Sequence, residues 1–233
     1  MMNMPLILNG ILNDIPGFLL RVPIVLFALS FHEFSHGYIA WKLGDPTAKN
    51  FGRLTLNPIK HLHPVGALMM LLFGFGFANP VPVNTRYFKK PKRDMALTAF
   101  AGPVSNLLLG VIGGFLYLAA RKIIITSGLW WNGSEFVQTL LSYTLLFFFM
   151  FFQLNVSLAI FNMLPIPPLD GSRVLFLFLP DKLYFGVMKY EQIIMGVLFV
   201  GLFFGVFDKP LLWLMNLVAD GILNLWSLLP FFQ

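Results

Sequence analysis

Long apolar runs constrain this chain more than any other feature of its sequence. Residues 17–43, 96–120, 136–164 and 184–207 are each long enough for the roughly 20 residues that a membrane-spanning helix needs, and 211–232 is a fifth, more mixed run. Only 11% of the residues are charged, whereas a soluble domain carries about 25%. The sequence therefore predicts an all-α integral membrane protein, a bundle of about five or six transmembrane helices.

The polar segments between these runs are too short to fold on their own. The longest, 42–63 and 79–94, are well below the ~50 residues of the smallest independent domains. We therefore expect residues 1–233 to form a single membrane-embedded domain. The net charge of +6 comes largely from lysines and arginines in loops beside the apolar runs. This distribution is typical of cytoplasmic loops and does not indicate nucleic-acid binding.

A shorter apolar segment, residues 64–77, lies between two basic loops. As a helix it would be ~21 Å long, which is less than the ~30 Å of the hydrocarbon core. If both loops are cytoplasmic, the segment enters the membrane and returns as a re-entrant loop. Asn79, Pro80 and Pro82 follow it, and irregular backbone at that depth must line protein or a water-filled cavity. The alternative is a short interfacial helix followed by a proline-rich loop.

The first apolar run contains the sequence HEFSH, which is an H-E-x-x-H motif. On a helix, His32 and His36 share one face and can reach the same metal ion. Glu33 lies one step around the helix, where it can accept a proton from water without being a ligand. The alternative is a polar cluster between helices. The chain has no cysteine, so a metal here must use histidine, carboxylate or water.

Two histidines leave a catalytic zinc site incomplete, because such a site usually has three protein ligands. His61 and His63 are candidates, but they lie in a polar segment before a proline. Asp170 is the better candidate, because it follows the helix-breaking prolines of NMLPIPPLDGSRV. Local sequence fits an N-cap role for Asp170 equally well. The need of the H-E-x-x-H motif for a third donor favours Asp170 as a ligand.

Together these motifs resemble the site-2 protease family (peptidase M50) of intramembrane zinc metalloproteases. HEFSH and NMLPIPPLDGSR carry the resemblance, and NPVPVN at 79–84 and AGPVSN at 101–106 are similar to the family's re-entrant loop and asparagine-bearing helix. The similarity extends from about residue 28 to 175. No segment is long enough for a PDZ or CBS domain, so the chain looks like a minimal bacterial-type member.

The resemblance implies one zinc ion per chain, held by His32, His36 and Asp170, with Glu33 as the general base. It also implies that Asn106 and Asn162 lie near the substrate as binding or oxyanion candidates. The catalytic core would be about 17–180, with C-terminal helices at about 184–232. The expected enzyme is a zinc metalloendopeptidase that cleaves a substrate in or near its transmembrane segment.

The resemblance also implies partners and a location. We expect the lipid bilayer, a transmembrane protein substrate and, as a candidate, a separate regulatory membrane protein. The expected location is the bacterial cytoplasmic membrane, with the active site nearer the cytoplasmic face. The competing function is a divalent-metal transporter or another metal-binding membrane protein, which would also place histidine and aspartate at a broken helix.

Three weaker patterns remain. The partial alternation in residues 48–58 fits either a short strand of a small membrane-associated β-sheet or a plain loop. Gly102, Asn106, Gly110 and Gly114 recur every four residues on one helix face. Small residues at this spacing predict that the helix packs closely against the metal-bearing helix and directs the Asn106 amide toward the site. The alternative is that Asn106 only bonds a neighbouring helix. Asn216, Asp220 and Asn224 also recur every four residues, and this stripe fits either a cavity lining or an interfacial helix.

Overall fold

The computed structural model describes residues 14–73 and 78–232, and all of their regular elements are helices. These are α2 (Ile15–Lys42), α3 (Thr47–Asn50), α4 (Pro58–His61), α5 (Pro64–Phe73), η1 (Thr85–Tyr87), α6 (Pro91–Thr126), α7 (Leu129–Asn132), α8 (Glu135–Asn162), α9 (Asp170–Phe176), α10 (Asp181–Met188), α11 (Glu191–Phe203), α12 (Asp208–Ser227) and η2 (Pro230–Phe232). The all-α expectation is confirmed for this part of the chain.

Three helices, α2, α6 and α8, are long and apolar enough to cross a membrane. The helices α11 and α12 qualify only as a pair, and they are bent by 84° at their junction. The described residues thus offer three spans, or four if the bent pair counts as one. This is fewer than the five or six that we expect, because the run 184–207 is divided between α10 and the 13-residue α11.

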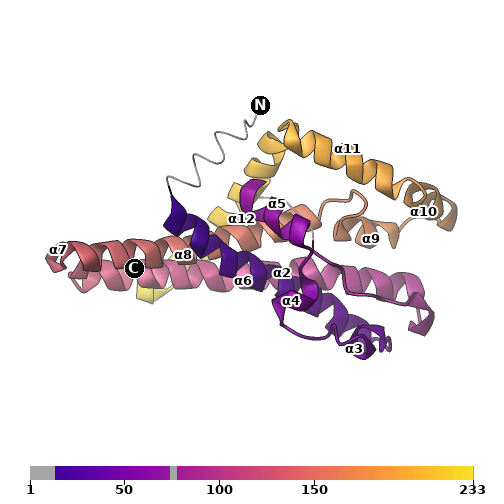
Figure 1. Cartoon of the computed structure of the whole chain (residues 1–233), viewed down its shortest axis with the longest axis horizontal. Coiled ribbons are helices and arrows are strands. Elements are labelled where there is room, and N and C mark those ends of the chain that lie inside the picture. Colours follow the sequence, from indigo (N-terminus) through magenta and orange to yellow (C-terminus); the bar gives the residue numbers. More distant parts are fainter. Residues whose placement is uncertain (1–13, 74–77, 233) are drawn as a thin grey trace.

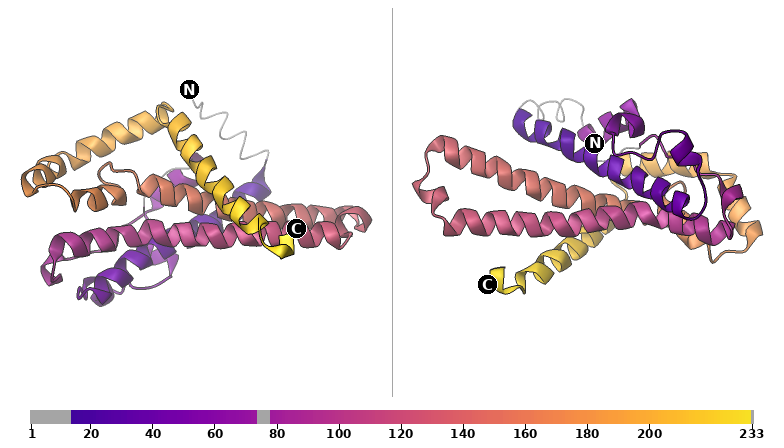
Figure 2. Two further views of the ribbon diagram at one scale, coloured as in Figure 1. Left: turned by 180° about the vertical axis from the view of Figure 1, so that it is seen from behind. Right: turned by 90° about the horizontal axis from the view of Figure 1, so that it is seen from below.

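Helix α6 is the central helix of the fold, and α2, α8, α9 and α12 all pack against it. Figures 1 and 2 show α6 and α8 side by side as an antiparallel pair, with α12 crossing them at an angle. One core cluster joins α2 to α8 through Val25, Ala28, Leu29 and Leu158. A second joins α8 to α12, with Phe152 and Ile222 at its centre. The three long helices thereby form one packed unit.

The small residues of α6 allow these close approaches, but not all toward the same helix. A Cβ on Gly102 would lie 2.5 Å from the His36 ring of α2. Cβ atoms on Gly110 and Gly114 would instead meet Val156 of α8 and Ile222 of α12, at 3.0 and 3.1 Å. The predicted close packing against α2 is thus found at Gly102, while Gly110 and Gly114 allow close packing of α6 against α8 and α12. The reason is that α6 continues well beyond the point where it crosses α2.

Residues 48–58 do not form a strand, which was one of the two structures that their sequence fits. Residues 47–50 form the short helix α3, and Gly52 then reverses the chain with a φ of 63°. The Arg53 amide donates to the Ala48 carbonyl at 2.8 Å, which closes this turn. A tight helical turn leaves no extended edge, and the described residues contain no strand with which a sheet could form.

The segment expected to be re-entrant begins with α5, a ten-residue helix that packs against α2. Residues 74–77 lie outside the described residues. The chain from 78 to 84 has no regular structure and returns toward α2 beside His61, whose carbonyl accepts the Asn79 amide at 2.8 Å. The depth of this segment in a membrane stays a prediction.

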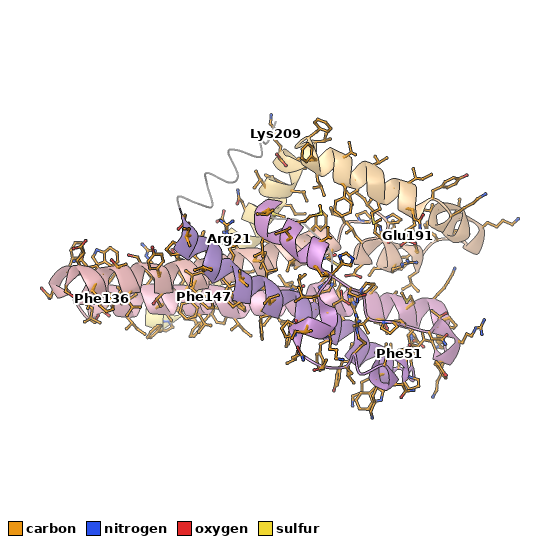
Figure 3. All side chains as sticks on the ribbon, viewed as in Figure 1. Arg21, Phe51, Phe136, Phe147, Glu191 and Lys209 are labelled. Carbon is orange, nitrogen blue, oxygen red and sulfur yellow. The ribbon has the colours of Figure 1, made fainter. Side chains whose placement is uncertain are left out.

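The break predicted at the prolines after residue 164 is confirmed, since α8 ends at Asn162 and α9 begins at Asp170. Gly171 makes the return possible, because a Cβ there would lie 2.2 Å from the Met163 carbonyl oxygen. Outside the core, many large apolar side chains are exposed, and Phe136 is 76% exposed. Figure 3 shows Phe136 on α8. Such a surface suits lipid rather than water.

Candidate metal centre

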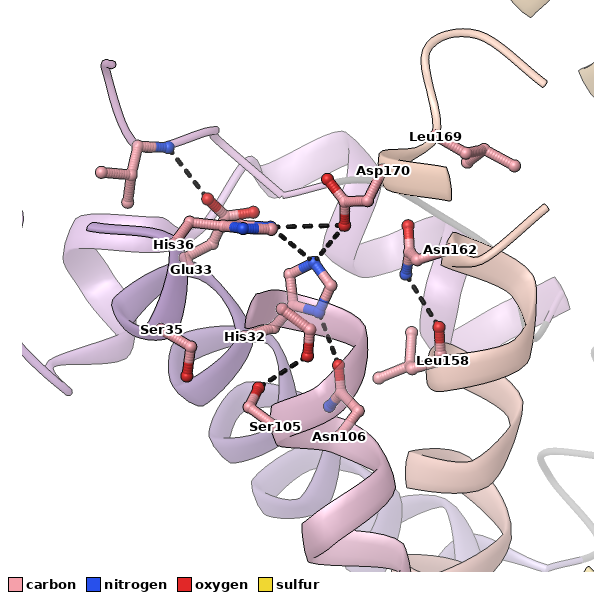
Figure 4. A network of polar contacts seen from close by, with 12 residues as sticks. His32, Glu33, Ser35, His36, Ser105, Asn106, Leu158, Asn162, Leu169 and Asp170 are labelled. Carbon is pink, nitrogen blue, oxygen red and sulfur yellow. Dashed lines mark hydrogen bonds and ion pairs between the residues drawn. The ribbon is translucent and has the colours of Figure 1, made fainter. Parts of the chain in front are cut away.

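Three side chains from two distant helices converge on one point. His32 and His36 lie one turn apart on α2, and their Nε2 atoms are 3.0 Å from each other. The Oδ2 atom of Asp170, the first residue of α9, lies 3.1 Å from the His32 Nε2 and 3.3 Å from the His36 Nε2. Figure 4 shows the two imidazoles and the carboxylate facing one another. The arrangement is a nearly equilateral triangle of potential ligand atoms.

This triangle has the dimensions of a zinc site. Ligand bonds of ~2.0 Å in tetrahedral geometry separate the ligand atoms by ~3.3 Å. The observed separations of 3.0 to 3.3 Å are close to that value. Two imidazoles and one carboxylate are also a donor set that suits zinc and leaves a fourth position open. The residues therefore fit a catalytic zinc ion.

The absence of a side chain on α6 makes room for the triangle. A Cβ on Gly102 would lie 2.5 Å from both Cε1 and Nε2 of His36 and 2.6 Å from Cε1 of His32. These distances are far shorter than any ordinary contact, so the two rings can occupy their positions only beside a glycine. The sequence predicts Gly102 as a packing residue, and the structure places it directly against the ligand atoms.

The remaining ring nitrogens of the two histidines are held by α6. The Nδ1 of His36 lies 2.8 Å from the carbonyl oxygen of Thr98, which can only accept a hydrogen bond. The Nδ1 of His32 lies 2.5 Å from Oδ1 of Asn106. These contacts place the proton on each Nδ1 and leave each Nε2 free to bind a metal.

The orientation of the Asn106 amide is fixed by its other partners. Its Nδ2 donates to Oδ1 of Asn155 at 3.0 Å and to the Ala28 carbonyl at 3.4 Å, so its Oδ1 must face His32. Asn155 in turn donates to the Phe151 carbonyl at 2.8 Å. Both asparagines are fully buried. Asn106 thus lies behind His32, whereas the resemblance implied a position beside the substrate.

Asn155 is a site residue that the sequence analysis missed. It belongs to the apolar run of α8, and its buried amide connects this helix to the histidine network. The available signal was a polar amide in an otherwise apolar helix, a residue type that usually marks an interhelical contact. The pairing with Asn106 depends on how α6 and α8 are aligned, which local sequence does not reveal.

Glu33 lies next to the triangle but is not part of it. Its side chain is buried, and Oε2 accepts a hydrogen bond from the Val81 amide at 2.9 Å. Among the described residues, the group whose atoms could share one metal ion consists of His32, His36 and Asp170. The glutamate is therefore held by the loop 78–84, beside the ligand atoms.

Asp170 shows no sign of the alternative capping role. Leu169 is the N-cap residue of α9, and no side-chain capping bond is found at this helix start. The other histidines are also separate from the triangle. The buried His61 has its Nε2 2.7 Å from the Thr55 carbonyl, and the Nδ1 of His63 accepts the Gly66 amide at 3.4 Å.

A cavity of about 640 Å³ opens onto the triangle and Glu33. Pro80, Val81 and Val83 line one side, and apolar side chains of α8, α11 and α12 line much of the rest. Asn162 is also in the wall, with its Nδ2 donating to the Leu158 carbonyl at 3.0 Å. The cavity is large enough for several residues of a peptide chain and is mostly apolar.

The other predicted residues are spread more widely. Asn79 is exposed, with its backbone bonded to His61, and Pro82 follows the cavity-lining Val81. Asn216, Asp220 and Asn224 form an exposed face of α12, opposite the buried Ala219 and Ile222, and lie outside the cavity wall. Of the two predictions for that stripe, the cavity lining is therefore not found.

The chain is similar to known zinc metalloproteases. The sequence model described as "Peptidase family M50" matches residues 21–207. The relative named "Putative zinc metalloprotease YwhC" from Bacillus subtilis is 40% identical over 204 residues, which are 87% of this chain and 89% of the relative. "Putative zinc metalloprotease Rip2" from Mycolicibacterium smegmatis is 32% identical over 170 residues, 70% of this chain and 59% of the relative. No solved structure matches the chain.

Proposed function

The chain belongs to peptidase family M50, the site-2 proteases, and is a zinc metalloprotease. We propose that it cleaves a peptide bond in or near the transmembrane segment of a membrane-protein substrate. The observation that carries the proposal is the triangle of His32, His36 and Asp170 with Glu33 beside it, at the wall of an apolar cavity. A metalloprotease needs this combination of three ligands and a separate base.

The two histidines and the aspartate have the role of metal ligands in this proposal. The zinc ion that they would hold supplies Lewis acidity, which makes water a usable nucleophile at neutral pH. Asn106 and the Thr98 carbonyl keep the two imidazoles in the tautomer and orientation that ligation requires. We assign Asn106 to this orienting role because it is buried behind His32.

Glu33 acts as the general base. It accepts the proton of the attacking water and then passes this proton to the leaving amine. The hydrogen bond from Val81 fixes Oε2 and leaves Oε1 for the proton transfer. Asn162 is the candidate for contact with the substrate, since its amide group has a second N–H besides the one that bonds Leu158. That N–H can hold a substrate carbonyl or the developing oxyanion.

The substrate must be unwound where it is cut, because the carbonyls of an intact helix are already hydrogen-bonded. Helix-destabilising residues near the scissile bond are therefore expected in the substrate. The apolar cavity wall favours an apolar segment such as a transmembrane helix. A regulatory membrane protein remains part of the proposal as a separate partner.

The basic residues suggest the orientation of the enzyme. Lys42 is the last residue of α2 and Lys49 lies in the following helix α3, and the loop before α6 carries a further group of lysines and arginines. By the positive-inside rule this end faces the cytoplasm. His36 is six residues from the end of α2, so the metal centre would lie ~10 Å below that face. Two of the similar zinc metalloproteases come from bacteria, and we place this protein in a bacterial cytoplasmic membrane in that orientation.

The competing transporter function is disfavoured by Glu33. A transport site would use this carboxylate as a further ligand, but it is bonded to the Val81 amide and lies outside the ligand group. The separation of base and ligands is what hydrolysis requires.

The test uses full-length protein in detergent micelles. The probe is a quenched fluorescent peptide whose ~20-residue apolar segment contains a central Asn-Gly pair. Glu33→Gln should retain one zinc ion per chain and lose cleavage, whereas Asp170→Ala should lose both. If Glu33→Gln loses its zinc while Asp170→Ala keeps it, or if a chelator leaves cleavage unchanged, the proposal is wrong.

A further inference from the structure

One backbone amide of the loop 78–84 bonds Glu33, and the residue on each side of that amide lacks an N–H. Glu33 Oε2 accepts the amide of Val81, which lies between Pro80 and Pro82 in the sequence NPVPVN. Proline has no N–H. A shift of this loop by one residue in either direction would therefore bring a nitrogen without a hydrogen to the carboxylate. The hydrogen bond that holds Glu33 therefore requires that the loop is not shifted by even one residue.

Arg53 holds the loop immediately before that donor. Its Nη2 donates to the carbonyl oxygen of Asn79 at 2.6 Å and to that of Pro80 at 3.2 Å. These are the two carbonyls that precede the Val81 amide in the chain. Arg53 itself is half-buried and comes directly after the tight turn at Gly52, so its backbone is fixed.

Two further contacts hold the ends of the loop but not its centre. The Asn79 amide donates to the His61 carbonyl at 2.8 Å, and the Asn84 amide donates to Oδ2 of the buried Asp45 at 2.7 Å. Pro80 and Pro82 cannot donate a hydrogen bond. Between the two anchors, the structure of residues 78–84 shows two kinds of main-chain hydrogen bond: the bond from the Val81 amide to Glu33, and the bonds from Arg53 to the Asn79 and Pro80 carbonyls.

We propose that Arg53 is a positioning residue for the general base. Its guanidinium donates hydrogen bonds to the Asn79 and Pro80 carbonyls and thereby fixes the loop in the register that places the Val81 amide against Glu33. This inference rests on the proposed function of Glu33. Arg53 lies outside the triangle of ligand atoms, so its removal leaves the metal in place and affects the step that the base performs.

The first test measures the loop directly and does not depend on cleavage. Hydrogen exchange of the Val81 amide should be slow in the wild type, because the amide is bonded to a buried carboxylate. Arg53→Ala should speed this exchange by at least tenfold, as should Glu33→Ala, which removes the acceptor. Arg86→Ala is the matched control, since Arg86 lies in η1 directly after the loop and its side chain is exposed. Unchanged exchange in Arg53→Ala would overturn the inference.

The second test separates the base from the metal and from substrate binding. With the quenched peptide, Arg53→Ala should lower kcat by about 10- to 100-fold, the usual effect of losing a supporting contact at a metal site. Zinc content should stay at one per chain, KM should change little, and Arg53→Lys should recover part of kcat. A general loss of structure would instead lower zinc content and raise KM.

A third comparison removes the donor itself. Val81→Pro eliminates the N–H, and Val81→Ala shortens the same side chain but keeps the N–H. The proline variant should have at least tenfold lower kcat than the alanine variant, and adding Arg53→Ala to it should cause little further loss. Full additivity would contradict the inference. Active Glu33→Gln would instead contradict the proposed function, so the two failures can be told apart.

Discussion

The Nδ1 atom of His32 lies 2.5 Å from Oδ1 of Asn106, and the amide of that asparagine is in turn held by Asn155. A ligand on α2 is thus oriented by α6, which is oriented by α8. The metal centre is supported by all three helices that are long and apolar enough to cross a membrane in the described part of the chain.

Asn106→Ala should weaken zinc binding by about 10- to 100-fold, because His32 loses the acceptor that fixes its ring. Competition with a metal-binding dye measures this affinity directly. Asn224→Ala is the control, since Asn224 is an exposed asparagine of α12. Equal zinc affinity in both variants would show that Asn106 does not orient the ligand.

Gly102→Ala should prevent zinc binding almost completely. The added methyl group would lie 2.5 Å from Nε2 of His36, so the ring must leave its place in the triangle. Gly221→Ala is the matched control, because a Cβ there meets nothing within 4 Å; alanine should even favour the α12 helix by about 1 kcal/mol. Zinc content by elemental analysis decides the prediction, and a normally loaded Gly102→Ala protein would contradict it.

Asn162→Ala should lower kcat by about 100-fold while zinc content stays unchanged. Its amide lines the cavity and donates to the Leu158 carbonyl rather than to a metal ligand. The substitution should therefore remove a hydrogen bond to the substrate carbonyl or to the developing oxyanion. Cleavage of the quenched peptide gives kcat and KM separately. A change confined to KM would indicate ground-state binding alone.

Zinc should stabilise the folded protein, because the three ligand atoms are together only in the native state. At a free zinc concentration of 100 times Kd the gain is about 2.7 kcal/mol. Thermal unfolding in micelles with zinc and with a chelator measures this difference. Asp170→Ala should lose the zinc-dependent shift, and Asp220→Ala, which changes an exposed aspartate of α12, should keep it.

Local sequence was sufficient to predict the part of the site that lies on a single helix. His32 and His36 are four positions apart, so any helix places them on one face. Asp170 was identified from chemistry and not from geometry, because a zinc site with two histidines needs a further donor. Its convergence with the histidines is a fact of tertiary structure, measured by the 3.1 and 3.3 Å separations.

Features that depend on how helices and loops are aligned could not be predicted. Asn155 and the exact position of Asn106 follow from the register of α8 against α6. The contact of Val81 with Glu33 requires the path of an irregular loop. The prediction of five or six spans is not confirmed, since the described residues offer three or four. Apolar composition does not show that the run 184–207 is interrupted near Tyr190, between α10 and α11.

The distance along the chain between the ligands has a consequence for biosynthesis. Asp170 follows His36 by 134 positions, so α2 enters the membrane long before the ribosome has made the third ligand. At that stage two histidines and a glutamate are present without a complete hydrolytic centre. The nascent chain therefore lacks a complete metal centre until α9 has been synthesised and Asp170 has folded back onto α2.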